Sequence, residues 1–448
     1  MCSYPEAHED PGEPENDSGF GVKALGVDIH CRGLGINLIE EKTKGGELQP
    51  GAEPRRPAVG GDQRYARALS PGAPVGERST EVLMSRSVRF AAMAALSAVT
   101  LLLAPTGRAV AGTTDPASEY YVALGASLVT GTGSTNGADY VNDLLAYAQP
   151  LIPGLVVENL ACGGETTTTM LHGGHCAKYT TGSQLGDAET FLKDHPGQVA
   201  FVTIDIGADD VLGCASNDVV NESCFETGLS KVEANLPQIV SGLRAASSTV
   251  PIVGMNYYDP FLAYWLNGSS GQEQAKESVG LVKQLNEVLS SDYANGEIAV
   301  ASPFKKFHTT DFRRSGIWKG QQVPANVATI CNWTWMCTPG GPTVHANNTG
   351  YAELAKAFEK VLVVPPSLSG TPPIATVGQQ YSFAFTISGI PRARVHNEGL
   401  LPKGLRLSEH GVLSGRPSQT GTYPFSVIAS NGKARTIVAS ESVTVGHT

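Results

Sequence analysis

The sequence predicts a three-layer α/β domain followed by a small all-β domain, and three observations carry this prediction. Between residues 112 and 363, short apolar runs alternate with segments of helical period. A Pro-rich stretch at 364–374 then reads as a linker. After it, residues 375–448 contain strand-like runs separated by Gly, Pro and Asn, which indicates a β-sandwich.

Five apolar runs of the first domain read as strands, and the segments between them read as helices. Ser183 is the expected N-cap of one helix, and Pro237 is expected to bend another. Such alternation predicts a parallel sheet covered on both faces, with functional sites at the carboxyl ends of the strands. The predicted strands are 119–125, 155–161, 198–207, 250–258 and 296–302, and the predicted helices are 140–149, 183–195, 229–246, 275–293 and 351–362.

Length, composition and charge bound the function. A chain of 448 residues with 41% hydrophobic residues has room for two packed domains. The formal net charge is −10 and the basic residues form no stripe or polybasic run, so nucleic acid is not an expected partner. Nothing in the composition indicates a cofactor or a metal, and we expect a monomer.

The N-terminal part of the chain has two contrasting segments. Residues 1–83 are polar and rich in Gly and Pro, which predicts disorder or a misassigned upstream start. Residues 84–111 then combine Arg86 and Arg89, an apolar run at 90–104 and an Ala-Val-Ala site, the layout of a secretory signal peptide. We therefore expect Met84 to be the true start and the protein to be secreted. The alternative is a membrane anchor with a cytoplasmic tail.

The cysteine pattern also fits an exported protein. Six of the eight lie after the cleavage site, in close sequential pairs: Cys162 and Cys176, Cys214 and Cys224, Cys331 and Cys337. Six cysteines allow fifteen connectivities, and export to an oxidising compartment favours three disulfides. A zinc site made by Cys162, His172, His175 and Cys176 is the alternative, although its spacing fits no common zinc pattern well.

Ser127 and His345 are the candidate nucleophile and base. Ser127 lies in a Gly-Ala-Ser turn after the first strand, and His345 lies in a polar loop before the last helix. A serine hydroxyl attacks only when a base takes its proton, and a distant histidine can converge on it at one edge of a parallel sheet. Seen alone, Ser127 is more simply a structural turn residue.

Two further segments end strands of the same sheet. Gly163 and Gly164 leave a backbone N–H open toward a bound oxygen, as an oxyanion site requires, although a flexible turn beside a disulfide has the same composition. Asp205, Asp209 and Asp210 place carboxylates after the third strand, where a metal site is a weaker alternative.

These segments, in this order, resemble the SGNH or GDSL-type hydrolases, which are serine esterases and lipases. The matching stretches are YVALGASL, NLACGGETTTTM, GSQLGDAETFL, FVTIDIGADDV and CNWTWMCTPGGPTVHANNTGY. The resemblance is closest to a secreted bacterial branch with three disulfides, and it implies a flavodoxin-like three-layer sandwich. It further implies Ser127 as nucleophile, His345 as general base, and the N–H groups of Ser127 and Gly164 as oxyanion donors.

The chain departs from the family pattern at three positions. Ala126 stands where the family has the GDSL aspartate, which mainly organises the turn. Asp209 stands where the family has an oxyanion Asn, and an ionised carboxylate there would repel the developing negative charge. Pro342 stands where an acid usually orients the histidine, so we expect the Pro342 carbonyl to take that role in a Ser–His dyad, with Thr343 a weaker substitute.

The sequence thus predicts a secreted serine hydrolase of carboxylic esters, with reduced activity if Asp209 is ionised. The alternative is a catalytically weak or inactive secreted protein of the same fold that binds a surface or a polymer. The substrate is a small-molecule or lipid ester, and four aromatic residues either line an acyl pocket or belong to the core: Tyr257, Tyr258, Trp333 and Trp335.

The C-terminal unit resembles the Ig-like domains appended to secreted bacterial proteins. The resemblance rests on Gly, Pro and apolar positions within LPKGLRLSEHGVLSGRPSQTGTYPFSVIASN. It implies a spacer, binding or adhesion module, with cell-surface or polysaccharide contact as the expected role.

Overall fold

The structure, a computed structural model, describes residues 119–216, 219–340 and 342–447. The upstream extension 1–83 and the predicted signal peptide 84–111 lie outside these residues. Within the described ranges, no helix has both the length and the apolar character needed to cross a bilayer.

A parallel five-stranded sheet forms the centre of the first domain, in the order β2-β1-β3-β6-β7. This is the flavodoxin-like order in which sites form outside the carboxyl ends of the strands. Strands β1 and β3 are buried along most of their length because helices cover both faces. The strands are β1 (Glu119–Gly125), β2 (Leu155–Asn159), β3 (Val199–Asp205), β6 (Ile252–Met255) and β7 (Ala299–Ala301).

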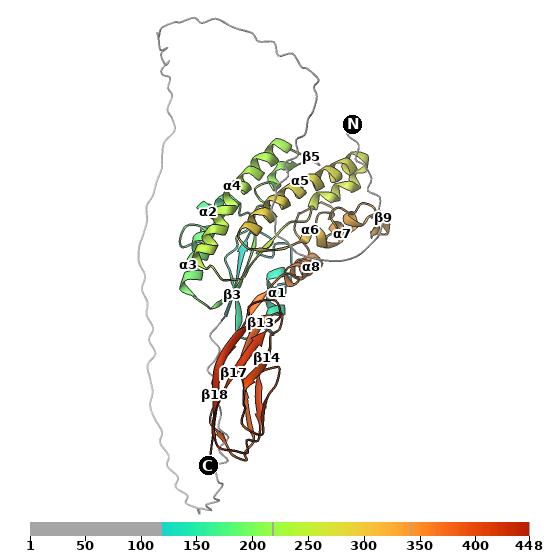
Figure 1. Cartoon of the computed structure of the whole chain (residues 1–448). Coiled ribbons are helices and arrows are strands. Elements are labelled where there is room, and N and C mark those ends of the chain that lie inside the picture. Colours follow the sequence, from blue (N-terminus) through green and yellow to red (C-terminus); the bar gives the residue numbers. More distant parts are fainter. Residues whose placement is uncertain (1–118, 217–218, 341, 448) are drawn as a thin grey trace, which may run out of the picture. The chain divides into compact units, whose positions relative to one another are not determined.

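Helices form two groups around this sheet. Helix α1 packs against α8, and α4 packs against α3 and α5. Figure 1 shows strand β3 between these two groups. The helices are α1 (Tyr140–Ala148), α2 (Thr167–His172), α3 (Gln184–Asp194), α4 (Glu222–Ala246), α5 (Gly268–Asn295), α6 (Pro303–Lys306), α7 (Ala325–Trp333) and α8 (Asn348–Glu359), with 3₁₀ turns η1 (Leu212–Cys214) and η2 (Pro260–Asn267).

Local sequence explains where the predicted helices begin. The Ser183 side chain accepts a hydrogen bond from the Gly186 N–H, which confirms the expected N-cap of α3. Helix α4 is longer than predicted because Asn221 caps it by accepting from the Cys224 N–H, and it continues through Pro237. Two short hairpins were not predicted: β4 (Ala215–Ser216) with β5 (Val219–Val220), and β8 (Ser315–Trp318) with β9 (Gln321–Pro324).

The second domain is all β, as predicted. Its two larger sheets have the orders β11-β18-β17-β14 and β12-β16-β15, and Leu413, Val427 and Val443 are fully buried in its core. The strands are β10 (Val364–Ser369), β11 (Ala375–Thr376), β12 (Tyr381–Ala384), β13 (Thr386–Ile390), β14 (Arg394–Gly399), β15 (Leu405–Leu407), β16 (Val412–Gly415), β17 (Gly421–Ser430) and β18 (Ile437–Gly446).

The segment 364–374 is not a simple linker. Its first part is strand β10, which pairs antiparallel with β13. Pro365 and Pro366 lie where the register shifts between Val364 and Ser367, so their missing N–H groups cost no ladder hydrogen bond. The prolines therefore mark an irregular strand at the start of the β domain.

Candidate active site

The turn that carries Ser127 begins at Gly125, the last residue of β1. Gly125 has φ +138°, and a Cβ there would lie 2.1 Å from the Asp205 carbonyl oxygen, so only glycine fits. The buried Gln184 side chain holds this residue on both sides. Its Oε1 accepts from the Gly125 N–H at 2.6 Å, and its Nε2 donates to the Gly125 carbonyl at 3.0 Å. The backbone before Ser127 is thus fixed.

His345 reaches Ser127 from the loop before α8. The His345 Nε2 and the Ser127 Oγ are 2.9 Å apart, although the two residues are separated by 218 positions. The loop is held by the Tyr258 hydroxyl, which donates to the Val344 carbonyl at 2.6 Å, and by the Trp335 N–H, which donates to the His345 carbonyl at 3.0 Å. The structure therefore brings together the predicted nucleophile and base.

The second nitrogen of His345 has a different partner from the predicted one. Its Nδ1 lies 3.3 Å from the Thr343 Oγ1, and no hydrogen bond to the Pro342 carbonyl occurs among the described residues. A threonine hydroxyl rotates to accept, so Thr343 can fix the tautomer in which Nδ1 carries the proton. Partial burial lowers the pKa of His345 below its ordinary value of 6.5. The imidazole is then neutral at neutral pH, as a general base must be.

The loop after β2 brings the two glycines close to Ser127. The Cys162 N–H donates to the Gly125 carbonyl at 3.2 Å, which ties this loop to the serine turn. A Cβ built on Gly163 would lie 4.0 Å from the Ser127 Cβ, and Gly164 has φ +80°. Both glycines are exposed, so the loop borders the site from the solvent side.

The three acids after β3 separate in the structure. Asp205 is buried and accepts from the Tyr140 hydroxyl at 3.0 Å. Asp210 accepts from the Thr167 N–H and hydroxyl, both at 2.8 Å. Asp205 and Asp209 both line the pocket beside Ser127, but within the described ranges no hydrogen bond reaches the Asp209 carboxylate. The divergent partners do not form the metal site considered from the sequence.

Asp209 is a strongly perturbed carboxyl. Burial is the main cause that raises its pKa to about 6, and the negative charge of Asp210 adds to it. His175 opposes this effect, and Glu165 adds a smaller contribution in the same direction as Asp210. Asp209 is therefore protonated below about pH 6 and ionised above it, in the pocket that Ser127 lines.

Disulfides join the predicted neighbours: Cys162–Cys176, Cys214–Cys224 and Cys331–Cys337. The ligand atoms of Cys162, His175 and Cys176 lie within 4.8 Å of one another, but His172 is not part of this group. Because both thiols are used in a disulfide, the zinc site considered from the sequence loses its thiolate ligands.

An apolar pocket opens from Ser127 and His345. Tyr257 and Tyr258 line it, whereas Trp333 packs on Phe307 and Trp335 donates its indole N–H to the Gly133 carbonyl. Sequence reasoning missed the rest of the lining, because the η1 turn and the β4–β5 hairpin carry no periodic signal and because helical period alone does not show which residues of α4 and α5 face a pocket. The other apolar lining residues include Leu212, Ala215, Val220, Phe225, Val282 and Leu285.

Comparison with known proteins identifies the families of the two domains. The GDSL-like Lipase/Acylhydrolase family matches residues 123–353, and the family described as "Putative Ig domain" matches residues 363–446. A search of curated proteins found no match.

Similar solved structures include three ester hydrolases. The lipase Lip_vut3 from a goat rumen metagenome is 15% identical, with 54% of this chain and 97% of that chain covered and a TM-score of 0.35. Phospholipase A1 from Streptomyces albidoflavus NA297 is 18% identical, with coverages of 55% and 100% and a TM-score of 0.31. The psychrotrophic esterase EstA from Pseudoalteromonas sp. is 14% identical, with coverages of 55% and 96% and a TM-score of 0.32. With the family match spanning half of the sequence, the chain belongs to the GDSL-like lipase/acylhydrolase family of ester hydrolases, and an Ig-like domain follows its α/β domain.

Proposed function

We propose that the protein hydrolyses carboxylic esters through an acyl-enzyme on Ser127. The observation that carries this proposal is the 2.9 Å contact between the Ser127 Oγ and the His345 Nε2 at the mouth of an apolar pocket. His345 takes the hydroxyl proton while Oγ forms a bond to the ester carbonyl carbon. The proton then passes to the departing alkoxide as the C–O bond to the alcohol breaks.

Deacylation uses the same pair in reverse. His345 takes a proton from water, the hydroxide oxygen attacks the acyl carbon, and the proton returns to the Ser127 Oγ as the acid leaves. The imidazolium formed in each step has the Thr343 hydroxyl rather than a carboxylate beside its Nδ1. The site is therefore a Ser–His dyad with a polar neighbour, and we expect slower turnover than a full triad gives.

The pocket supports an acyl chain as the group that Ser127 carries. Its wall beyond the serine is aliphatic and aromatic, from η1, β4, β5 and α5, and burying each CH₂ of a substrate there is worth about 0.8 kcal/mol. We propose fatty-acyl esters as the preferred substrate class over acetylated sugars.

Hydrolysis of p-nitrophenyl esters from acetate to palmitate by purified residues 112–448 tests this proposal. Ser127→Ala is the control, and we expect it to show only background turnover. Absence of Ser127-dependent turnover with every ester contradicts the enzymatic proposal and favours a binding protein of the same fold. The ionisable Asp209 in the pocket is the observation that supports that second candidate.

Val220→Trp tests the pocket itself. Val220 lines it, so the added indole should lower kcat/KM for long esters about tenfold or more and leave acetate hydrolysis within about twofold. Val219→Trp is the matched control, because the neighbouring Val219 is 57% exposed and is not among the lining residues. Equal behaviour of the two variants contradicts the pocket assignment.

We further propose that the protein is secreted from a start at Met84. A separate proposal is that the Ig-like domain contacts a cell surface or a polysaccharide. The Arg-flanked apolar run and Ala-Val-Ala site support export. Mass spectrometry of the cell-associated precursor tests the start, since peptides from residues 1–83 would contradict it. Cosedimentation of residues 112–448 with isolated cell walls tests the contact.

A further inference from the structure

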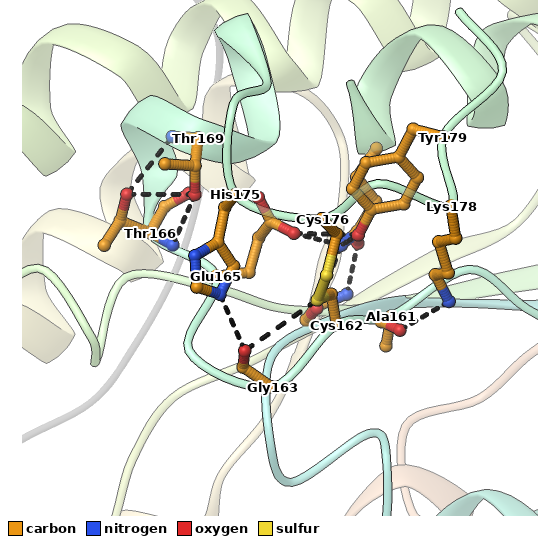
Figure 2. The surroundings of a disulfide bond; sticks show 12 residues. Ala161, Cys162, Gly163, Glu165, Thr166, Thr169, His175, Cys176, Lys178 and Tyr179 are labelled. Carbon is orange, nitrogen blue, oxygen red and sulfur yellow. Dashed lines mark hydrogen bonds between the residues drawn. A yellow bond between two sulfur atoms is a disulfide. The ribbon is translucent and has the colours of Figure 1, made fainter. Parts of the chain in front are cut away.

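His175 lies beside the candidate oxyanion loop and has no part in the Ser127–His345 pair. Its Nε2 is 2.8 Å from the Gly163 carbonyl oxygen, as Figure 2 shows. The Cys162–Cys176 disulfide brackets this contact, because Cys162 precedes Gly163 and Cys176 follows His175. Since a carbonyl only accepts, the hydrogen bond requires the proton to be on Nε2.

This hydrogen bond selects one of two orientations of a peptide group. In a trans peptide the C=O and the next N–H point in opposite directions, so fixing the Gly163 carbonyl also fixes the Gly164 N–H. A peptide between two glycines turns over easily, because neither residue has a Cβ to oppose the change. The Glu165 N–H donates to the Cys162 carbonyl at 3.3 Å and joins the ends of this turn, but that bond does not fix the peptide between the two glycines. A donor from outside the turn can therefore select its orientation.

The surroundings of Gly164 favour the same arrangement. A Cβ on Gly164 would lie 3.1 Å from the His175 Nε2, so the imidazole packs closely over this residue. Gly163 lies on the Ser127 side of the loop, at 4.0 Å from its Cβ by the same construction. His175 is therefore next to both glycines of this loop.

We propose that His175 is a positioning residue of the oxyanion hole: its Nε2–H holds the Gly163 carbonyl away from the site and thereby aims the Gly164 N–H at the oxyanion formed on Ser127. This inference rests on the proposed function. It assigns no contact between His175 and substrate. Because the hydrogen bond is solvent-exposed, its loss should be partial rather than complete.

Three substitutions at one position test the proposal. A Gln amide nitrogen takes about the place of the imidazole Nε2, whereas an Asn amide nitrogen takes about the place of Nδ1 and is too short to reach. We expect His175→Ala and His175→Asn to lower kcat for a p-nitrophenyl ester about tenfold with KM within about twofold. His175→Gln should retain kcat within about threefold of the wild type.

A tetrahedral adduct separates positioning from general disturbance. An alkylboronic acid forms a B–O bond with the Ser127 Oγ and presents an oxyanion-like hydroxyl, so its Ki should rise about tenfold in the Ala and Asn variants and little in the Gln variant. Thermal unfolding checks that all three variants fold. His172→Ala is the matched control, since His172 is exposed and lies outside the Cys162–His175–Cys176 group, and it should behave as wild type.

The outcomes distinguish a failure of the proposed role of His175 from a failure of the proposed hydrolase function. Ser127-dependent turnover with unchanged kcat in His175→Ala overturns the role of His175 and leaves the proposed function intact. Equal losses in the Ala and Gln variants, or a change in KM alone, also overturn it. A wild-type protein with no Ser127-dependent turnover overturns both.

Discussion

The two sides of the candidate site differ in how completely the chain supplies what catalysis needs. On one side, Ser127 and His345 are in hydrogen-bond contact, and Gln184 and Tyr258 fix the backbone around them. On the other side, the Gly163–Gly164 loop is exposed and Asp209 brings a carboxylate where the family has an amide.

The same contrast explains why two departures from the family pattern have different weight. Ala126 is 6% exposed in the turn, and its N–H is bonded to the buried Asp205 carboxylate, so no polar group is left unpaired there. Asp209 has no such partner in the described part of the chain. Ala126 leaves the hydrogen bonds of the turn intact, whereas we expect a charge at Asp209 to weaken oxyanion binding.

Removal of the base, His345, should change activity more than substitutions at Asp209 or Thr343. We expect His345→Ala to lower kcat about 10⁴-fold, because His345 is the only base within hydrogen-bond distance of the Ser127 Oγ among the described residues. Steady-state hydrolysis of a p-nitrophenyl ester measures this, with the exposed His396→Ala as control. Retention of a tenth of the wild-type kcat would show that the 2.9 Å contact is not used in turnover.

Asp209→Asn tests the side of the site that carries the Gly163–Gly164 loop and the Asp209 carboxylate. Because the folded-state pKa of Asp209 is raised to about 6, the group is neutral below that pH and negatively charged above it. Wild-type kcat/KM should therefore decline as pH rises through about 6, and Asn should remove the decline, with a gain of ~10²-fold at pH 8 and a smaller gain at pH 5. The acidic limb that persists in the variant reports His345, whose pKa lies below its ordinary value.

The pH profile of kcat/KM with a long-chain ester is the measurement for that substitution. Asp194→Asn, an exposed change at the end of α3, is the control for lost charge. If the Asp209→Asn profile follows that of the wild type, the ionised carboxylate does not weaken oxyanion binding.

Thr343→Val should have the smallest effect. The valine keeps the shape and removes the oxygen that lies 3.3 Å from the His345 Nδ1, so kcat should fall about threefold to tenfold. Thr343→Ser keeps the hydroxyl and should stay near the wild type. Equal rates for the two variants would indicate that the backbone alone orients the imidazole.

Much of this arrangement follows from sequence patterns, and the exceptions have physical reasons. The alternation of strands and helices predicts the sheet, because each segment repeats its apolar residues with a clear period. The sequence does not predict strand β10, because Pro365 and Pro366 are typical of a linker. The strand accommodates both prolines only through a register shift in its pairing with β13. Which of Asp209 and Asp210 faces the pocket depends on a hydrogen bond to Thr167, forty-three residues away from Asp210.

The partner of the His345 Nδ1 shows a second kind of limit. The family resemblance favours the residue three positions before the histidine, but the loop conformation brings the Thr343 hydroxyl to the ring instead. Side-chain rotamers within a short loop are set by the elements that anchor it, here the Tyr258 hydroxyl and the Trp335 N–H. Tyr258 is 86 residues away from Val344 in sequence, so sequence spacing gives no sign of this anchor.

Gln184 has a consequence for how the protein tolerates change. A primary amide offers an acceptor oxygen and an N–H donor like those of the backbone, and Gln184 directs its oxygen and one N–H to Gly125 while Nε2 also donates to the Tyr179 hydroxyl. The two hydrogen bonds to Gly125 are like those that a paired strand would make, but they come from the side chain of Gln184, the first residue of helix α3. The turn that carries Ser127 is therefore tied to the start of helix α3. An insertion or deletion there would shift the Ser127 side chain even though no residue of the active site itself is changed.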